Sequence, residues 1–379
     1  MFEEYIQKTG KVMRLGYTTG SCAALSAKAA TRMLLTGTPC YEIAILTPKG
    51  IPLSVLVEDI CLTDDGASCA VRKDAGDDPD ITDGVLVYAR VAKTASGIIT
   101  IDGGEGVGRV TRKGLNQPVG AAAINQVPRQ MIEQEVGVVC EECGYDGGIS
   151  VLISVPNGES LAKKTFNPYL GIEGGLSIIG TSGIVEPMST QAILDTIDTE
   201  MKMYAAEGVR EIIFTPGNYG QKFLLNHPTI ALRQTIKCSN FIGESLDMAA
   251  FHGFTSVLIV GHIGKLAKLA GGIMNTHSSM ADGRRELLAL HAALVGGNVS
   301  LLKAILATAT ADEALSLIDK AELRYEVMKS LLDAADSYLA RRAKGALLVG
   351  ALTFSHQIDF LEISAAGQEI LEQWGHTHE

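Results

Sequence analysis

The sequence lacks long apolar runs and has no excess of basic residues. No stretch approaches the roughly 20 continuous apolar residues that span a bilayer, and the opening segment MFEEYIQKTGKVMRL is polar and of mixed charge. A formal net charge of -11 disfavours nucleic acid and anionic membranes as partners, because clustered lysines and arginines bind phosphate groups. We therefore expect a cytoplasmic protein that contacts neither.

Cysteine is also sparse. Seven cysteines in 379 residues, an odd and scattered set, favour reduced thiols over a disulfide framework. Cys140 and Cys143 have the spacing of a metal-binding pair, but a structural zinc needs further ligands and the sequence has no second pair. We therefore expect no metal bound by the protein itself.

Short alternating apolar runs dominate the first half of the chain. The segment SCAALSAKAATRMLL predicts a helix capped by Ser21. Residues 41–57 predict an antiparallel hairpin around the turn Thr47-Pro48-Lys49-Gly50. Further strands are expected at 68–73, 84–93, 97–101 and 149–155. Residues 1–160 are therefore predicted to form an α+β domain with a Gly-rich loop.

In the second half, apolar strand-like runs alternate with helical patterns. Strands are expected at 176–180, 211–216 and 256–261, with helices at 189–206, 219–226, 240–252 and within 284–343. This alternation is typical of a doubly wound, Rossmann-like parallel sheet. We predict an α/β domain over residues 161–379, with a boundary near 156–172 and close packing between the domains.

Three clusters in the first half could bind an anion or a planar ligand. Glycines and hydroxyl residues, including Thr19 and Ser21, run directly into a helix start, although a purely structural turn explains them equally well. Arg72 and Lys73 precede an acidic turn whose spacing matches no calcium loop. The glycines of 103–108 permit close backbone approach, but they do not open a helix as a dinucleotide loop would.

Two loops of the second half are expected at one edge of the predicted sheet. Gly180, Thr181, Ser182 and Gly183 follow one expected strand, and Glu186 could accept hydrogen bonds from ribose hydroxyls. The next expected strand is followed by Gly217, Asn218 and Gly220. These loops predict a cofactor pocket, but they do not distinguish S-adenosylmethionine from NAD or a nucleotide.

A third stretch gathers hydrogen-bond donors. His262 and Lys265 follow the strand expected at 256–261, and Asn275 and His277 close the next glycine-rich turn. The spacing excludes a Walker A loop. Each histidine could be an acid, a base, a metal ligand or a structural residue. Together with Lys265 and Asn275 they favour a pocket for a polyanion.

Six motifs in order resemble one known family. They are LGYTTGSCAA, VRKDAGDDPDIT, GEGVGRVT, NPYLGIEGGLSIIGTSGIVEPMS, SNFIGESLDMA and GHIGKLAKLAGGIMNTHSSMADGRRE. The series is similar to that of the CbiD family, the cobalt-precorrin-5B C1-methyltransferases of anaerobic cobalamin biosynthesis. The resemblance spans nearly the whole chain and weakens after about residue 300.

The resemblance implies methyl transfer from S-adenosylmethionine to C1 of a corrinoid, giving cobalt-precorrin-6A and S-adenosylhomocysteine, with cobalt as part of the substrate. The cofactor would lie against Gly180 to Gly183, Glu186 and Gly217 to Gly220. Substrate carboxylates would meet Thr19, Ser21, Arg72, Lys73, His262, Lys265, Asn275 and His277. His262 and His277 are the catalytic candidates, and a homo-oligomer is possible. Two alternatives stay open: a small-molecule kinase that uses Gly20-Ser21, and a tetrapyrrole carrier without catalysis.

Overall fold

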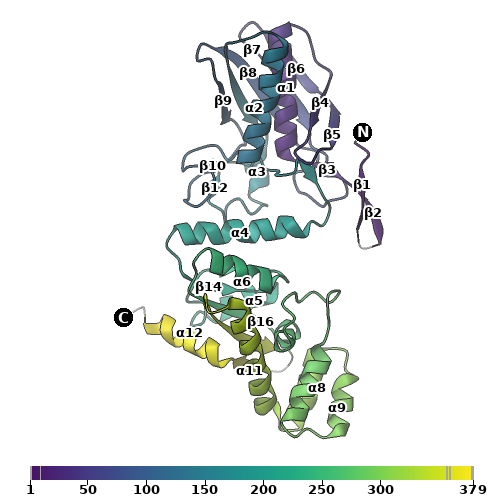
Figure 1. The fold of residues 1–379 in the computed structure, drawn as a ribbon, viewed down its shortest axis with the longest axis vertical. Helices are drawn as coiled ribbons and strands as arrows, with labels where there is room; N and C mark the ends of the chain where they lie inside the picture. Colours follow the sequence, from purple (N-terminus) through teal and green to yellow (C-terminus); the bar gives the residue numbers. More distant parts are fainter. Residues whose placement is uncertain (1, 9, 356, 358–359, 377–379) are drawn as a thin grey trace. The chain divides into compact units, whose positions relative to one another are not determined.

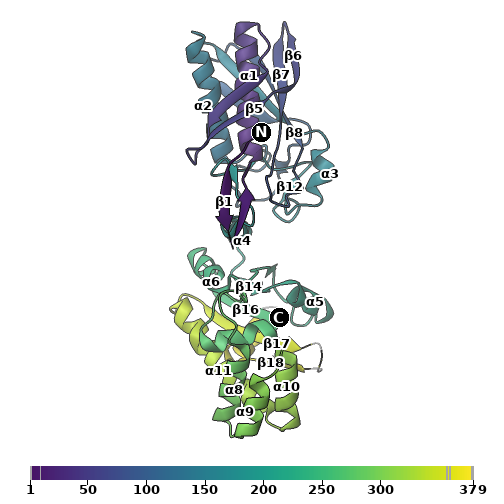
Figure 2. The ribbon, with the colours of Figure 1, turned by 90° about the vertical axis from the view of Figure 1, so that its right-hand side faces the viewer.

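A computed structural model describes residues 2–8, 10–355, 357 and 360–376. The chain divides into two compact units, Met1–Thr190 and Gln191–Glu379, whose elements are drawn in Figures 1 and 2. This division falls after the 160/161 boundary expected from the sequence, because two short strands beyond residue 160 pair within the first unit. β12 (Ile172–Glu173) pairs with β10 (Arg109–Val110), and β13 (Ile184–Val185) pairs with β3 (Gly16–Tyr17).

A five-stranded sheet forms the centre of the first unit. Its spatial order is β6 (Glu58–Thr63), β7 (Gly66–Arg72), β8 (Leu86–Thr94), β11 (Gly148–Ser154) and β9 (Ile99–Gly103). All neighbours are antiparallel except β11 and β9. Helices α1 (Thr19–Thr36) and α2 (Gln126–Glu142) lie side by side against it (Figures 1 and 2).

Period-two burial in the central strands matches this one-sided cover. Val87, Ala89 and Val91 of β8 are buried beneath the helices, whereas Arg90 is exposed. The remaining elements of the unit are short: β1 (Tyr5–Lys8), β2 (Lys11–Arg14), β4 (Glu42–Leu46), β5 (Pro52–Leu56) and α3 (Gly158–Ala162). β4 and β5 form the hairpin predicted over residues 41–57.

Helix α1 begins one turn earlier than the sequence predicted. Thr18, not Ser21, is the N-cap: its side chain accepts a hydrogen bond from the Ser21 amide. Ser21 lies inside the first turn, and its hydroxyl is used elsewhere. The helix ends at Gly37, whose positive φ of 70° suits glycine.

The second unit contains a second five-stranded sheet. Its order is β15 (Thr235–Ile236), β14 (Glu211–Phe214), β16 (Ser256–His262), β17 (Leu348–Ser355) and β18 (Phe360–Ile363). The first four strands are mutually parallel, and β18 is antiparallel to β17. The helices are α4 (Thr190–Ala206), α5 (Asn218–Asn226), α6 (Ile242–Phe251), α7 (Ile263–Leu266), the 3₁₀ helix η1 (Ala267–Gly271), α8 (Arg284–Leu294), α9 (Val299–Leu306), α10 (Ala311–Lys320), α11 (Arg324–Ala343) and α12 (Ala365–His376).

Both faces of this sheet are buried. Ile212 of β14 packs into a core that includes α4, α6 and α11, whereas its neighbour Ile213 packs with α5 and α12 on the other face. A strand covered on both faces reads as a continuous apolar run, which is why β14 and β16 were predicted from the sequence. Trp374 of α12 is buried, and its indole donates to Ser256 Oγ at 2.9 Å.

One predicted strand of this sheet is absent from it. Residues 176–180 belong to the first unit, where Leu176 and Ile178 form only isolated bridges with Val107 and Ile124. The backbone of this segment bonds to loops rather than to a strand ladder. β17, β18 and α12 are elements that the sequence patterns did not predict. In the described part of the chain, each helix is too short or too polar to cross a membrane.

Asp336 of α11 carries a testable feature of this fold. Its carboxylate accepts a hydrogen bond from the Ala366 amide at the start of α12 (2.9 Å), and burial raises its pKa above the ordinary value of 3.8. The folded state therefore holds this proton more tightly than the unfolded state. Its contribution to stability is greatest below pH 3.8 and is lost as pH rises through the raised pKa.

Asp336→Asn keeps an acceptor for Ala366 and removes the ionisation. We expect the variant to melt about 2–4 °C higher than the wild type at neutral pH, with the difference shrinking as pH falls toward 4. Thermal melts followed by circular dichroism across this range measure it. A difference that stays constant with pH would contradict the assignment.

Candidate functional site

In the parallel sheet of the second unit, the order in which successive strands are placed reverses between β14 and β16. The chain passes from β14 to β15 on one side, and then returns to place β16 on the other side of β14. In open α/β sheets, ligands bind beyond the carboxyl ends of the strands at such a switch point. The loop after β14 and helix α7, which follows β16 directly, therefore mark the candidate site.

The segment after β14 lies in direct contact with the end of β16. A Cβ added at Gly220 would lie 2.5 Å from the carbonyl oxygen of Val260, and one at Gly261 would lie 2.9 Å from Pro216 Cγ. Only glycine fits at either position without a shift. Gly220 in the first turn of α5 thus lets that helix start directly against the end of β16.

Lys265 of α7 connects the loop after β14 to the segment before α6. Its ammonium donates to the carbonyl of Pro216 and, at 2.8 Å, to Asn240 Oδ1. Gly217, the N-cap of α5, has a φ of 137° and provides no capping side chain, and a Cβ there would lie 3.5 Å from Lys265 Nζ. The first turn of α5 and one ammonium group therefore face the same space.

Asn240 connects this site to the turn predicted at Asn275. Its Oδ1 also accepts from Thr276 Oγ1 at 3.2 Å, and its carbonyl accepts from the Thr276 amide at 2.9 Å. Asn275 forms a bridge with Phe241. Asn240 belongs to the motif SNFIGESLDMA, but it was not predicted as a site residue. An asparagine between a short strand and a helix has no sequence feature that marks it as part of a binding site.

Positive charge gathers here. Lys237 donates to Asn218 Oδ1, and Lys268 is buried and donates to the carbonyls of Thr276 and Ala281. Burial, together with the neighbouring lysines, lowers the pKa of Lys265 below its usual 10.5, against the smaller opposing effect of Cys238. This edge therefore suits an anionic group.

His262 lies at the end of β16 with both ring nitrogens engaged. Nδ1 accepts from the Gly264 amide at 3.1 Å, which places the proton of the neutral ring on Nε2. Nε2 lies 3.4 Å from Asp312 Oδ1, and Asp312 also accepts from Ser355 Oγ. His262 thus caps α7 and pairs with Asp312, which is a positioning role rather than that of a ready base.

His277 lies in an exposed turn. Its Nδ1 lies 2.6 Å from Ser279 Oγ and accepts from the Ser279 amide, while its own amide donates to Asn275 Oδ1. The structure places His262, Lys265, Asn275 and His277 in one unit with Gly217 to Gly220. It supplies local hydrogen-bonding roles for each of them.

Gly180 to Gly183 do not share this edge. They lie in the first unit, against the start of α1: the amides of Thr18 and Gly20 donate to the carbonyls of Gly183 and Ile179, and Ser21 Oγ donates to Gly183 at 2.6 Å. Thr19 Oγ1 accepts from the Ile179 amide at 3.0 Å. The prediction of one pocket at a common sheet edge is wrong, because residues 176–183 fold onto α1 instead.

The start of α1 is consequently filled by protein. Thr19 and Ser21 are buried, and a Cβ at Gly180 would lie 2.1 Å from Thr18 Oγ1. Hydrogen bonds that an anion would need here are already made to the loop. The phosphate loop required by the kinase alternative is therefore not open in this structure.

The other predicted residues of the first unit form ion pairs. Glu186 pairs with Lys49, exposed Arg72 makes a two-pronged contact with Glu58, and buried Lys73 pairs with Asp80. The carboxylates of the acidic turn after Lys73 are likewise used in hydrogen bonds within the first unit. Its carboxylates bind Arg14 and the backbone amides of Ala75, Gly76, Thr82 and Met188.

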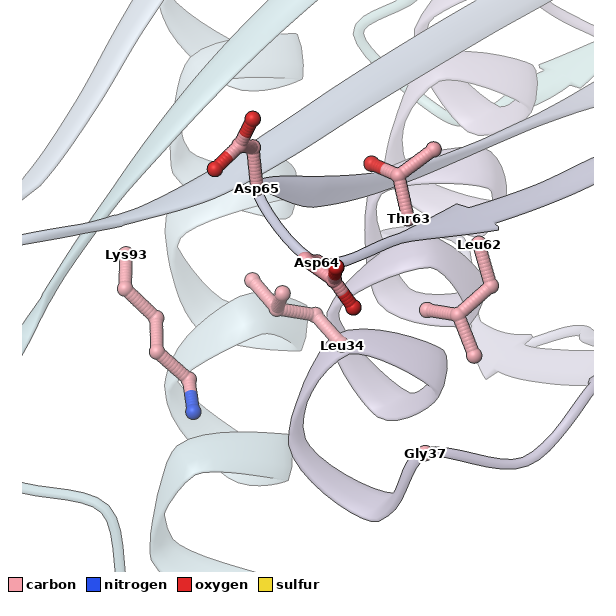
Figure 3. A pocket seen from close by; sticks show the side chains of 7 residues that line it. All are labelled: Leu34, Gly37, Leu62, Thr63, Asp64, Asp65 and Lys93. Carbon is pink, nitrogen blue, oxygen red and sulfur yellow. The ribbon is translucent and has the colours of Figure 1, made fainter.

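A separate hollow lies at the opposite end of α1 (Figure 3). It is lined by Leu34, Gly37, Leu62, Thr63, Asp64, Asp65 and Lys93. None of the predicted site residues reaches it. Within the residues that the structure describes, no three histidine, cysteine, aspartate or glutamate side chains are grouped so as to hold a metal ion.

The second unit has the features of α/β proteins that bind small ligands beyond the carboxyl ends of parallel strands. Comparisons with known proteins identify the family. The CbiD family model matches residues 6–187, and the model of the CbiD C-terminal domain matches residues 275–362. The chain belongs to the CbiD family.

Curated relatives support this membership along the full chain. The cobalt-precorrin-5B C(1)-methyltransferase of Ruminiclostridium cellulolyticum is 48% identical over 341 residues, covering 90% of this chain and 88% of the relative. The enzyme of the same name from Alkaliphilus metalliredigens is 46% identical over 376 residues, covering 98% and 99%. A crystal structure of cobalamin biosynthesis protein (cbiD) from Archaeoglobus fulgidus is 28% identical, covers 74% of this chain and 87% of its own, and has a TM-score of 0.41.

Close packing at Gly220 can be tested directly. Gly220→Ala forces a methyl group against the Val260 carbonyl, and we expect a loss of about 1–3 kcal/mol in the stability of the second unit. Gly375→Ala is the matched control, because a Cβ at this α12 position meets nothing within 4 Å. Denaturant unfolding measures both. Equal stability of the two variants would contradict the tight contact.

Proposed function

We propose that this protein is a cobalt-precorrin-5B C1-methyltransferase that transfers a methyl group from S-adenosylmethionine to its corrinoid substrate. Its relatives of nearly equal length have that name. The cobalt enters as part of the substrate. The observation that carries the proposal within the structure is the β14/β16 switch point, where the loop after β14 touches the end of β16 and is bonded to Lys265 of α7.

In this proposal the methyl donor binds in the second unit alone. The first turn of α5, from Gly217, and the Lys265 ammonium receive the carboxylate of its methionine part. An ammonium group has three N–H donors, and Pro216 and Asn240 account for two of those at Lys265. Gly180 to Gly183 and Glu186 have no part in this site.

Methyl transfer from a sulfonium to a nucleophilic ring carbon needs alignment of three atoms more than it needs a strong acid or base. The engaged nitrogens of His262 agree with this requirement. Its pairing with Asp312 keeps the ring in one orientation at the edge of the site. We therefore assign His262 a positioning role, and we assign Lys265 the recognition of the donor.

The first test compares how tightly the wild type and Lys265→Met bind two ligands. S-adenosylhomocysteine has the carboxylate and 5′-methylthioadenosine lacks the amino acid part. We expect the variant to bind S-adenosylhomocysteine at least tenfold more weakly than the wild type, equivalent to about 1.4 kcal/mol, and to bind 5′-methylthioadenosine with unchanged affinity. Isothermal titration calorimetry measures both dissociation constants.

Lys329→Met serves as the control, because Lys329 is an exposed lysine of α11. It should bind both ligands as the wild type does. Wild-type protein that binds ATP but not S-adenosylhomocysteine would refute the methyl donor. Equal losses for both ligands in Lys265→Met would refute the carboxylate contact while leaving the donor in place.

The lowered pKa of Lys265 predicts a pH effect. The ammonium is charged below its pKa, so carboxylate binding is lost as pH rises through that value, and the loss begins at lower pH than for an ordinary lysine. We expect the affinity of the wild type for S-adenosylhomocysteine to fall already below the usual lysine pKa of 10.5, with a flat profile for Lys265→Met. If affinity fell with pH in the same way for the wild type and Lys265→Met, Lys265 could not be the group whose titration weakens binding.

A further inference from the structure

Three aromatic rings lie along one face of α5 in the second unit. Tyr219, Phe223 and His227 follow one another at intervals of four residues, which places their side chains on the same side of the helix. Phe223 stacks on Phe354 of β17, with ring centroids 4.3 Å apart, and His227 stacks on Phe223 at 3.9 Å. Because Phe223 and Phe354 are both buried, this packing fixes α5 against the end of β17 without any ligand.

Tyr219 is the most exposed of the three rings. It is 65% exposed, whereas Phe223 is 7% exposed. The ring centroid of Tyr219 lies 6.1 Å from that of His262, within the range of aromatic contacts. His262 meets Phe354 edge-on at 5.8 Å, and its Nδ1 accepts from the Gly264 amide. An exposed aromatic ring therefore lies beside an imidazole whose orientation is fixed.

The place of Tyr219 in the fold distinguishes it from other exposed rings, since single apolar side chains are common on protein surfaces. Phe251 is 85% exposed and also lies beside a histidine ring, that of His252, with centroids 5.2 Å apart. Phe251 ends α6, which leads into the start of β16, whereas Tyr219 lies beside His262 at the carboxyl end of β16. Of these two rings, Tyr219 is at the edge where open α/β sheets bind their ligands.

The carboxyl end of β16 offers different chemistry on its two sides. Lys265 bonds to Asn240, which lies in the segment after β15. His262 instead contacts Phe354 of β17. Because the spatial order of the strands is β15, β14, β16, β17, these two contacts run in opposite directions from β16. An ammonium therefore lies on one side of the switch point, and the ring of Tyr219, next to His262, lies toward the other side.

We propose that the ring of Tyr219 stacks on the adenine of the S-adenosyl donor and so determines the specificity of the site for that base. This inference rests on the proposed function, in which Lys265 and the first turn of α5 receive the donor's carboxylate. The adenine and the carboxylate are at opposite ends of the donor, as Tyr219 and Lys265 are on opposite sides of the end of β16. Adenine is the flat aromatic group of this molecule, and aromatic side chains hold bases by stacking on their faces.

The test titrates the intact protein calorimetrically with three ligands. S-adenosylhomocysteine has both ends of the donor, 5′-methylthioadenosine has the base without the carboxylate, and S-ribosylhomocysteine has the carboxylate without the base. For Tyr219→Ala we expect at least about fivefold weaker binding of the two ligands that contain adenine, because one stacking contact is lost. It should bind S-ribosylhomocysteine as the wild type does. Tyr219→Phe keeps the ring and should bind all three ligands with wild-type affinity.

Phe251→Ala is the matched control, because it removes an exposed ring beside a histidine at the other end of β16. It should bind every ligand as the wild type does, and all variants should keep the wild-type circular dichroism spectrum. Wild-type affinity of Tyr219→Ala for S-adenosylhomocysteine would overturn the stacking contact and leave the methyl donor in place. A loss that spares 5′-methylthioadenosine, or that is equal in Tyr219→Phe, would also overturn it. Wild-type protein that binds neither adenine-containing ligand would overturn this inference and the proposed function together.

Discussion

The bond between the Lys265 ammonium and Asn240 is the interaction on which the candidate site depends. Through it, α7 is bonded to the segment before α6, while the second bond of Lys265 joins α7 to the loop after β14. A partly buried ammonium is costly unless it is hydrogen-bonded. The Pro216 carbonyl and Asn240 Oδ1 offset the cost of burying the ammonium. The same two hydrogen bonds hold α7, the loop after β14 and the segment before α6 together.

Glycine makes the same arrangement possible from the side of the backbone. α5 starts against β16 because Gly220 has no side chain, and the chain enters α5 through Gly217, whose φ of 137° other residues rarely adopt. A side chain at Gly220 would push the helix start away from β16, and one at Gly217 would strain the backbone where the helix begins. The position of the start of α5 thus depends on these two glycines.

Much of the second unit could be predicted from the sequence, because its strands are apolar on both faces and its helices alternate with them. The same reasoning failed at residues 176–180, where an apolar run of similar appearance bonds to α1 and to loops of the first unit. A hydrophobic pattern in the sequence indicates that a segment is buried, but it does not indicate which element the segment packs against. The N-cap of α1 was predicted wrongly at Ser21 for a similar reason, since Thr18 and Ser21 are both residue types that cap helices well.

The site could be predicted only in part, and the division has a physical cause. Gly217, Lys265 and Asn275 follow strands or glycine turns, so their convergence at one edge follows from the parallel sheet. Asn240 acts through a hydrogen bond that no local pattern announces. Glu186 and Gly183 had the right chemistry, but their hydrogen bonds are made to Lys49 and to the start of α1.

These assignments have a consequence for how the proposed reaction would be driven. His262 has its proton on the nitrogen that faces Asp312, and its other nitrogen holds the start of α7, so withdrawing a substrate proton would require breaking the cap. Alignment of donor and acceptor requires no such step. A site built from a glycine loop packed on the end of β16, a hydrogen-bonded ammonium and an imidazole with both nitrogens engaged is therefore better suited to holding a sulfonium donor in line than to acid–base chemistry.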